Sequence, residues 1–277
     1  MRFQNTFSGV IRKFFLNFIF VVGCCLPLNG FELKRVILST NNNPLYIEFW
    51  PIVAPIWKSM GLQPTLALIA NEDCPVDVSV GDIIRLTPIQ GIPESLQAQV
   101  IRLFLPSFFP DEGCLISDID MIPISHSYFI NGAAHCPENG FLVYRDRAHE
   151  GTRYPMCYVA AKGEIFSSIF KISHTDEIIT KMQQWADLGL GWNTDELLLY
   201  ESVNEWEKEG GLVVRLGHEV EARLDRGNWK IDFSTLDISQ YIDCHCPRPY
   251  SAFKDSIDQV VNAIKNSISI CRTDQER

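Results

Sequence analysis

The chain has 277 residues, which is enough to bury one well-developed hydrophobic core. Hydrophobic residues make up 46% of it and charged residues 21%, a composition that excludes a disordered or fibrous protein. The formal net charge of -10 argues against a nucleic-acid partner, because phosphate contacts need a basic face. An acidic protein can still bind a diphosphate when a divalent cation lies between them.

Residues 1–30 combine a basic start with an apolar run. Arg2, Arg12 and Lys13 precede the uncharged stretch from Phe14 to Leu28. This stretch is shorter than the roughly 20 residues of a membrane-spanning helix and closer to a signal-peptide core. We expect residues 1–30 to be a signal peptide or membrane anchor, and residues 31–277 to form a single domain. A bacterial lipoprotein site at Cys24, or a hydrophobic helix docked on the domain, are the alternatives.

Short apolar strands alternate with helices in the first part of the domain. Strands are expected at Lys34–Ser39, Thr65–Ala70, Asp82–Leu86 and Gly113–Ser117, and helices at Tyr46–Met60 and Glu94–Leu105. This alternation predicts an α/β fold with a mixed, mostly parallel sheet flanked by helices. Ligands of such sheets bind beyond the carboxyl ends of the strands. We therefore expect the loops after Ser39, Ala70 and Ser117 to share one site.

The pattern changes beyond residue 121. Strands are expected at Phe141–Tyr144, Met156–Ala161 and Leu212–Leu216, and helices at Glu177–Leu188, Asp195–Lys208 and Ser251–Ser267. Residues 217–250 are rich in aromatic residues and proline and are expected to be mostly loop. No repeat or low-complexity linker interrupts the chain, which again favours one domain.

Asp118 and Asp120 follow the apolar run of the fourth expected strand. Two carboxylates at the end of a buried strand suit a hard cation such as Mn²⁺ or Mg²⁺, which fills its other positions with water and phosphate oxygens. The alternative is a solvated turn at the end of the strand.

Asp195 and Glu196 open an expected helix directly after Trp192, Asn193 and Thr194. The purely structural interpretation is a helix capped by Asn193 or Thr194, with acidic residues in its first turn. The functional interpretation is a carboxylate that acts as a base on an acceptor hydroxyl.

His245 lies between Cys244 and Cys246, and Arg248 follows three residues later. A neutral imidazole is a good metal ligand, and an arginine can stabilise a departing diphosphate. A structural zinc site usually needs a second pair of ligands at short spacing, and the sequence offers none. A purely structural histidine is the alternative.

These three elements, in this order and after these strands, resemble the GT-A class of nucleotide-sugar glycosyltransferases with an Asp-x-Asp motif, over residues 34–250. The resemblance implies a GT-A-like, Rossmannoid fold. It also implies transfer of a sugar from a UDP- or GDP-sugar to a glycan or other hydroxyl acceptor, with Mn²⁺ or Mg²⁺ as cofactor. The stretch His245–Tyr250 looks like the late metal-binding element of several such families, although its spacing is compressed and a glycine often found there is missing.

The resemblance also implies roles for individual residues. Asp118 would face the ribose and share the metal, Asp120 would bind the metal directly, and His245 would complete the protein ligands. Arg248 would face the diphosphate.

Other residues would surround the donor and the acceptor. Thr40 and Asn41, with Glu72 or Asp73, would line the nucleotide pocket, and Arg102 would lie near the nucleotide or its phosphates unless it is a solvated helix charge. Asp195 and Glu196 would stand at the acceptor. If Asp195 reaches the acceptor hydroxyl opposite the diphosphate, the reaction inverts configuration, which we expect in preference to retention.

Two other functions remain open at this point. Phosphatases of the haloacid dehalogenase type also use Asp-x-Asp and Mg²⁺, but on their first strand. A non-catalytic sugar-binding lipoprotein at the cell surface is the second. For a transferase, the need for a nucleotide sugar predicts a secretory-pathway enzyme, or one associated with the membrane through residues 14–28 that faces the cytoplasm if the host is bacterial.

Overall fold

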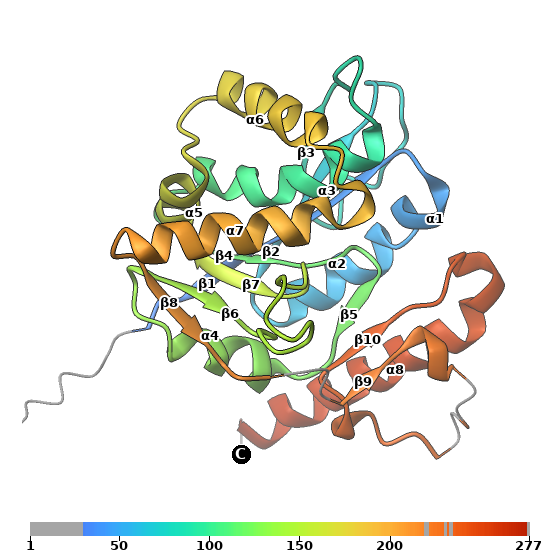
Figure 1. Ribbon diagram of the computed structural model, residues 1–277. Coiled ribbons are helices and arrows are strands. Elements are labelled where there is room, and N and C mark those ends of the chain that lie inside the picture. Colours follow the sequence, from blue (N-terminus) through green and yellow to red (C-terminus); the bar gives the residue numbers. More distant parts are fainter. Residues whose placement is uncertain (1–29, 219–221, 230–231, 233–234, 276–277) are drawn as a thin grey trace, which may run out of the picture.

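A seven-stranded sheet runs through the centre of the computed structural model, which describes residues 30–218, 222–229, 232 and 235–275 (Figure 1). Its strand order is β3-β2-β1-β4-β7-β6-β8. β7 is antiparallel to both neighbours, and the other pairs are parallel. The predicted α/β fold with a mixed, mostly parallel sheet is thereby confirmed. The strands are β1 (Leu33–Asn41), β2 (Gln63–Ile69), β3 (Asp82–Leu86), β4 (Gly113–Ile116), β6 (Gly140–Val143), β7 (Val159–Lys162) and β8 (Leu212–Arg215).

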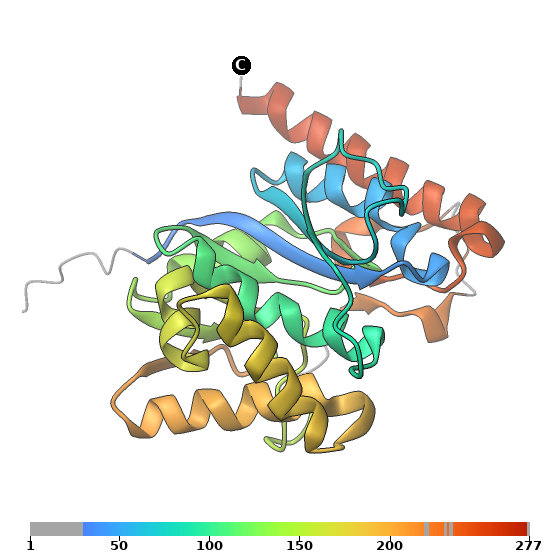
Figure 2. The same ribbon diagram turned by 90° about the horizontal axis from the view of Figure 1, so that it is seen from above.

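Helices cover both faces of this sheet. Figures 1 and 2 show α3, α5, α6 and α7 on one face, and α2 and α8 on the other. The helices are α1 (Pro44–Ile47), α2 (Trp50–Ser59), α3 (Glu94–Phe104), α4 (Gly132–Ala134), α5 (Gly163–Phe170), α6 (Thr175–Asp187), α7 (Thr194–Lys208) and α8 (Tyr250–Gln275). Short helical turns are η1 (Leu105–Phe108), η2 (Ser127–Asn131), η3 (Gly191–Asn193), η4 (Arg226–Asn228) and η5 (Ile238–Gln240).

The central strand β1 separates two hydrophobic cores. Val36 and Leu38 belong to the core under α2 and α8, whereas Ile37 points into the core under α3, α5, α6 and α7. All three side chains are fully buried. The run Val36–Leu38 is apolar because this part of β1 is covered on both faces, which is why the sequence identified the strand.

A second, three-stranded sheet lies beyond the end of β4. It consists of β5 (Met121–Pro123), β10 (Asp243–His245) and β9 (Arg223–Leu224), in the order β5-β10-β9. β5 begins directly after Asp120, and its antiparallel pairing with β10 places His245 opposite Met121. This small sheet therefore connects the two distant parts of the predicted site.

Several predicted boundaries differ from the structure. The helix expected over Tyr46–Met60 is divided into α1 and α2, because Pro51 stands in the first turn of α2 and cannot continue an earlier helix. Met156, Cys157 and Tyr158 precede β7 instead of forming its first half. The sequence did not predict α5, and the expected loop region 217–250 contains β9 and β10.

The predicted N-terminal segment, residues 1–30, lies outside the described part of the chain except for Gly30. In the part that the structure describes, no helix combines the length and the apolar character needed to cross a membrane.

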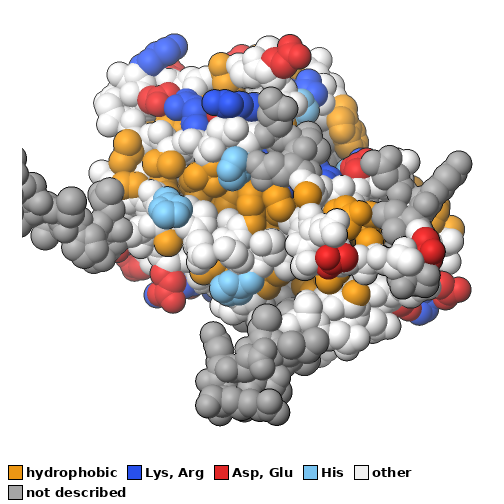
Figure 3. Space-filling model, turned by 90° about the horizontal axis from the view of Figure 1, so that it is seen from below, with side chains coloured by type: hydrophobic (Ala, Val, Ile, Leu, Met, Phe, Trp, Pro, Cys, Tyr) orange, Lys and Arg blue, Asp and Glu red, His pale blue; other side chains and the backbone are white. Residues whose placement is uncertain are grey.

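On the face seen from below, hydrophobic side chains gather in a band that also contains histidines (Figure 3).

Candidate active site

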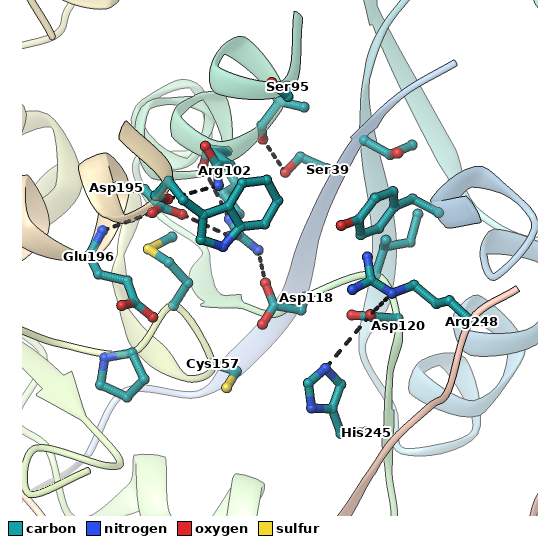
Figure 4. Close-up of a pocket in the computed structure, with 18 of the residues that line it drawn as sticks. Ser39, Ser95, Arg102, Asp118, Asp120, Cys157, Asp195, Glu196, His245 and Arg248 are labelled. Carbon is teal, nitrogen blue, oxygen red and sulfur yellow. Dashed lines mark hydrogen bonds and ion pairs between the residues drawn. The ribbon is translucent and has the colours of Figure 1, made fainter. Parts of the chain in front are cut away.

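A cavity of about 870 Å³ opens at the carboxyl ends of β1 and β4. Its walls come from the end of β1, α1, α3, the turn after β4, the segment before β7, the start of α7, and the region of β9 and β10. Ligand pockets of small molecules typically enclose about 300–1,000 Å³, so the cavity can accommodate a molecule of considerable size. Figure 4 shows carboxylates and cationic side chains facing one another across it.

Asp120 and His245 meet in this cavity although 125 positions separate them along the chain (245 minus 120). His245 Nε2 lies 3.7 Å from Asp120 Oδ2. The backbone amide of Cys246 donates a 2.9 Å hydrogen bond to the carbonyl oxygen of Asp120, which fixes the two segments to each other. Burial lowers the pKa of His245, but its interaction with Asp120 outweighs this and the net shift is upward.

This pair fits a divalent cation. Bonds of about 2.0–2.2 Å from one ion to two ligands place those ligands about 3–4 Å apart, which includes the observed 3.7 Å. Asp118 is turned toward Arg102 instead (Figure 4). Consistent with this, no group of three His, Cys, Asp or Glu side chains within the described residues is arranged as a metal cluster. Of the predicted metal ligands, Asp120 and His245 are therefore in direct proximity, whereas Asp118 lines the same cavity but is paired with Arg102.

Asp225 fixes the orientation of the His245 ring. Its Oδ1 lies 3.0 Å from His245 Nδ1. In the tautomer with the proton on Nδ1, the ring donates a hydrogen bond from Nδ1 to Asp225. The lone pair of Nε2 then points toward Asp120 and is free to bind a cation. Asp225 also accepts a 3.1 Å hydrogen bond from the backbone amide of Gly227. This bond caps η4, the short turn that carries Arg226.

Two arginines share the Asp120 carboxylate with His245. Arg248 Nε lies 3.4 Å and Arg226 Nη1 3.7 Å from Asp120 Oδ2. Arg248 also packs over the ring of Tyr46, with its guanidinium carbon 4.3 Å from the ring centroid. The guanidinium groups of Arg226 and Arg248 thus lie beside the Asp120 carboxylate in the cavity, where they suit the oxygens of an anionic ligand.

Arg102 lies between two acidic residues at the opposite side of the cavity. It forms an ion pair with Asp118, and its Nη2 donates a 3.0 Å hydrogen bond to Asp195 Oδ2. Burial raises the pKa of Asp118, yet the attraction of Arg102 outweighs it and lowers the pKa overall. The Asp195 side chain is less exposed than that of Asp118, and burial raises the pKa of Asp195 to about 6. Arg102 is therefore a buried bridge between the metal side and the acidic pair on α7, not a solvated helix charge.

Asp195 and Glu196 differ in how they face the cavity. The Asp195 side chain is 4% exposed and bound to Arg102, whereas that of Glu196 is 20% exposed. Glu196 Oε2 pairs with Arg153 Nε at 2.6 Å, and its Oε1 lies 3.8 Å from His149. The expected side-chain cap from Asn193 or Thr194 is absent from α7, where Thr194 donates to the carbonyl of Gly191.

The predicted nucleotide-binding residues divide into two groups. Thr40 and Asn41, at the end of β1, line the cavity. Glu72 and Asp73 are exposed on the loop after β2 and do not line it. Although β1 and β2 end at the same edge, the loop after β2 places these two side chains away from the cavity.

Sequence reasoning missed Arg145 and Cys157 as residues of the cavity. Arg145 comes directly after the expected strand that corresponds to β6, and this position at a strand end was the available signal. Arg223, which also lines the cavity, lies in the part of the chain that the sequence predicts to be mostly loop. It belongs instead to β9 and binds Asp243, while Asp225 binds His245.

Comparison with known proteins shows no match to any protein-family model and none to a curated protein. Among solved structures, the galactosyltransferase LgtC in complex with donor and acceptor sugar analogs is similar, with 10% identity and a TM-score of 0.47 over 83% of this chain and 96% of LgtC. The glycosyltransferase GlyE of Streptococcus pneumoniae has 14% identity and a TM-score of 0.46 over 85% of this chain and 65% of GlyE. Both of these proteins are glycosyltransferases.

Proposed function

We propose that this protein transfers a sugar from a nucleoside-diphosphate donor to an acceptor hydroxyl, with Mn²⁺ or Mg²⁺ bound at Asp120 and His245. The observation that supports this most strongly is the 3.7 Å approach of these two side chains, with Arg226 and Arg248 on the same carboxylate. A carboxylate and an imidazole suit the cation, and guanidinium groups suit phosphate oxygens. Together they form a site for a metal-bound diphosphate.

Residues on one side of the cavity would bind the donor, and residues on the other side would bind the acceptor. A cation bound there would neutralise negative charge on the diphosphate as it departs. Arg248 and Arg226 would bind the phosphate oxygens from the side of β10 and η4. Thr40 and Asn41 would contact the nucleoside at the end of β1.

The acceptor would approach from the side of α7. Glu196 is the more exposed of the two carboxylates there, which makes it the better placed to accept a proton from a hydroxyl. Asp195 would act through Arg102, which it binds together with Asp118. We propose Glu196 as the group that contacts the acceptor and Asp195 as a positioning residue.

The test is release of nucleoside diphosphate by the full-length protein from a panel of UDP- and GDP-sugars, with Mn²⁺ and with a chelator. Release that requires the metal is expected. Phosphate release from phosphomonoesters would instead identify a phosphatase, and the absence of both activities would favour a binding protein. The phosphatase is disfavoured because Asp118, the first aspartate of the motif, is paired with Arg102 and follows the fourth strand of the chain.

Replacement of Asp225 with Asn is expected to weaken Mn²⁺ binding about 10- to 100-fold, because His245 loses the charged partner that orients it. Calorimetric titration with Mn²⁺ in the presence of UDP measures this. Asp237→Asn is the matched control, since Asp237 accepts from Ser239 at the start of η5 as Asp225 accepts from Gly227 at the start of η4. Equal affinities of the two variants would contradict the role of Asp225.

A further inference from the structure

A second group of charged side chains reaches the cavity beside the proposed metal and diphosphate site. Arg145 follows β6, Arg223 belongs to β9, and both bind the carboxylate of Asp243 on β10. Arg145 Nη2 lies 3.0 Å from Oδ2, and Arg223 donates at 2.9 Å to Oδ1 and at 2.8 Å to Oδ2. Arg145 and Arg223 line the cavity, whereas Asp243 is fully buried behind them.

The carboxylate of Asp243 accepts four hydrogen bonds, three of them at Oδ2. Besides the three hydrogen bonds from Arg145 and Arg223, it accepts one of 2.9 Å from the hydroxyl of Tyr158. Four is about the number that an ionised carboxylate can accept. Two guanidinium groups therefore share one carboxylate, and the cluster carries an excess of one positive charge away from bulk water.

Arg145 also has donors that nothing satisfies. Its side chain is 1% exposed, and its Nε and Nη1 have no hydrogen-bond partner among the described residues. Leaving a buried charged donor unpaired is costly, so this guanidinium needs an acceptor from outside the cluster. These two nitrogens are buried, so an anionic ligand in the cavity would meet the more exposed Arg223 first and would reach Arg145 only after a rearrangement of the cluster.

The position of the cluster indicates which part of a ligand it would contact. Arg223 Nη2 lies 3.4 Å from the sulfur of Cys157. Figure 4 shows Cys157 below Asp118, between Glu196 on one side and His245 on the other. The cluster thus adjoins the space between the diphosphate side and the acceptor side, which is where the sugars of a transfer reaction would lie.

We propose that Arg145 and Arg223 form a subsite for a sugar carboxylate, so that one of the two sugars in the reaction is a uronic acid or a similar acidic sugar. This inference rests on the proposed function. The planar guanidinium matches the two oxygens of a carboxylate. A single negative charge also balances the single excess positive charge, which a doubly charged phosphate monoester would not.

Matched sugars test this in the full-length protein. The first arm uses calorimetry with Mn²⁺ to compare UDP-glucuronate with UDP-glucose, which differ only at C6, a carboxylate in one and a hydroxymethyl group in the other. The second arm compares methyl glucuronide with methyl glucoside in the presence of UDP. In one of the two arms the acidic sugar is expected to bind at least about tenfold more tightly. The arm that shows the preference identifies the donor or the acceptor as the acidic sugar. Equal binding in both arms would overturn the proposal.

Two variants separate the subsite from the diphosphate site. Arg223→Gln is expected to abolish the preference for the acidic sugar and leaves Asp243 paired with Arg145. Arg226→Gln, near Asp120, is expected to weaken both UDP-sugars by the same factor and to keep the preference. A preference that persists in folded Arg223→Gln would contradict the subsite, and thermal unfolding shows whether that variant is folded.

Failure of the proposed function would be recognisable separately. If no nucleotide sugar binds, sugar transfer from such donors is excluded, and the methyl glycoside pair measured without UDP still decides whether the cavity selects a carboxylate.

Discussion

The variant Asp120→Asn is expected to lose at least about 10³-fold in metal-dependent release of nucleoside diphosphate. Its carboxylate would bind the cation directly, and the loss of charge stabilisation by a metal corresponds to several kcal/mol in the transition state. The fold should persist, because Asp120 is tied to Cys246 through its backbone carbonyl and not its side chain. Steady-state assays with the best donor of the panel measure the effect.

Asp176→Asn provides the control for this variant. Asp176 is an exposed residue in the first turn of α6 and does not line the cavity. Its replacement removes the same charge from the molecule and is expected to leave the rate unchanged. If Asp120→Asn kept more than about a tenth of the activity, a cation bound by Asp120 could not be the principal support of the leaving diphosphate.

The variant Arg102→Met is expected to lower the free energy of unfolding by about 3–5 kcal/mol, because it leaves Asp195 as a buried carboxylate without its cation and deprives Asp118 of its partner. The guanidinium side chain is only 7% exposed, so water cannot replace it. Urea unfolding, followed by circular dichroism, measures the change.

A second substitution tests the physical reason. Adding Asp195→Asn to Arg102→Met removes one of the unpaired charges and is expected to recover at least about 1 kcal/mol. Lys254→Met, which removes an exposed ion pair with Asp258 on α8, is expected to leave the urea midpoint unchanged within error. A loss below about 1 kcal/mol in Arg102→Met would show that the Asp118–Arg102–Asp195 bridge does not stabilise the fold.

The first part of the fold was predictable because its strands are buried on both faces. β1 contains the apolar run Val36–Leu38, β4 is apolar throughout, and Asp118 and Asp120 follow β4 after Ser117. This local pattern suffices to place the two aspartates at the sheet edge, and the parallel pairing of β1 with β4 brings Thr40 and Asn41 to the same edge.

The arrival of His245 could not be derived from local pattern. β10 has three residues, and it exists because it pairs with β5 and β9, both of them also short. Such strands have no periodicity of their own, so their pairing depends on the completed tertiary structure. Only the resemblance to a family of enzymes suggested that His245 would meet Asp120, and the 3.7 Å distance agrees with that suggestion.

The ion pairs of the cavity were the least predictable feature. Arg102, Arg145 and Arg223 each bind carboxylates far away in the sequence, and nothing near them in the chain identifies those partners. Their burial follows from tertiary packing. The local sequence around an arginine does not show whether its side chain will be buried.

The most direct test of the account is a titration of the full-length protein with Mn²⁺, followed by electron paramagnetic resonance of the free ion, with and without UDP. We predict one bound Mn²⁺ whose affinity increases when UDP is present and which is lost in His245→Ala. Binding that is unchanged in His245→Ala, or no binding even with UDP, would contradict a metal-bound diphosphate at Asp120 and His245.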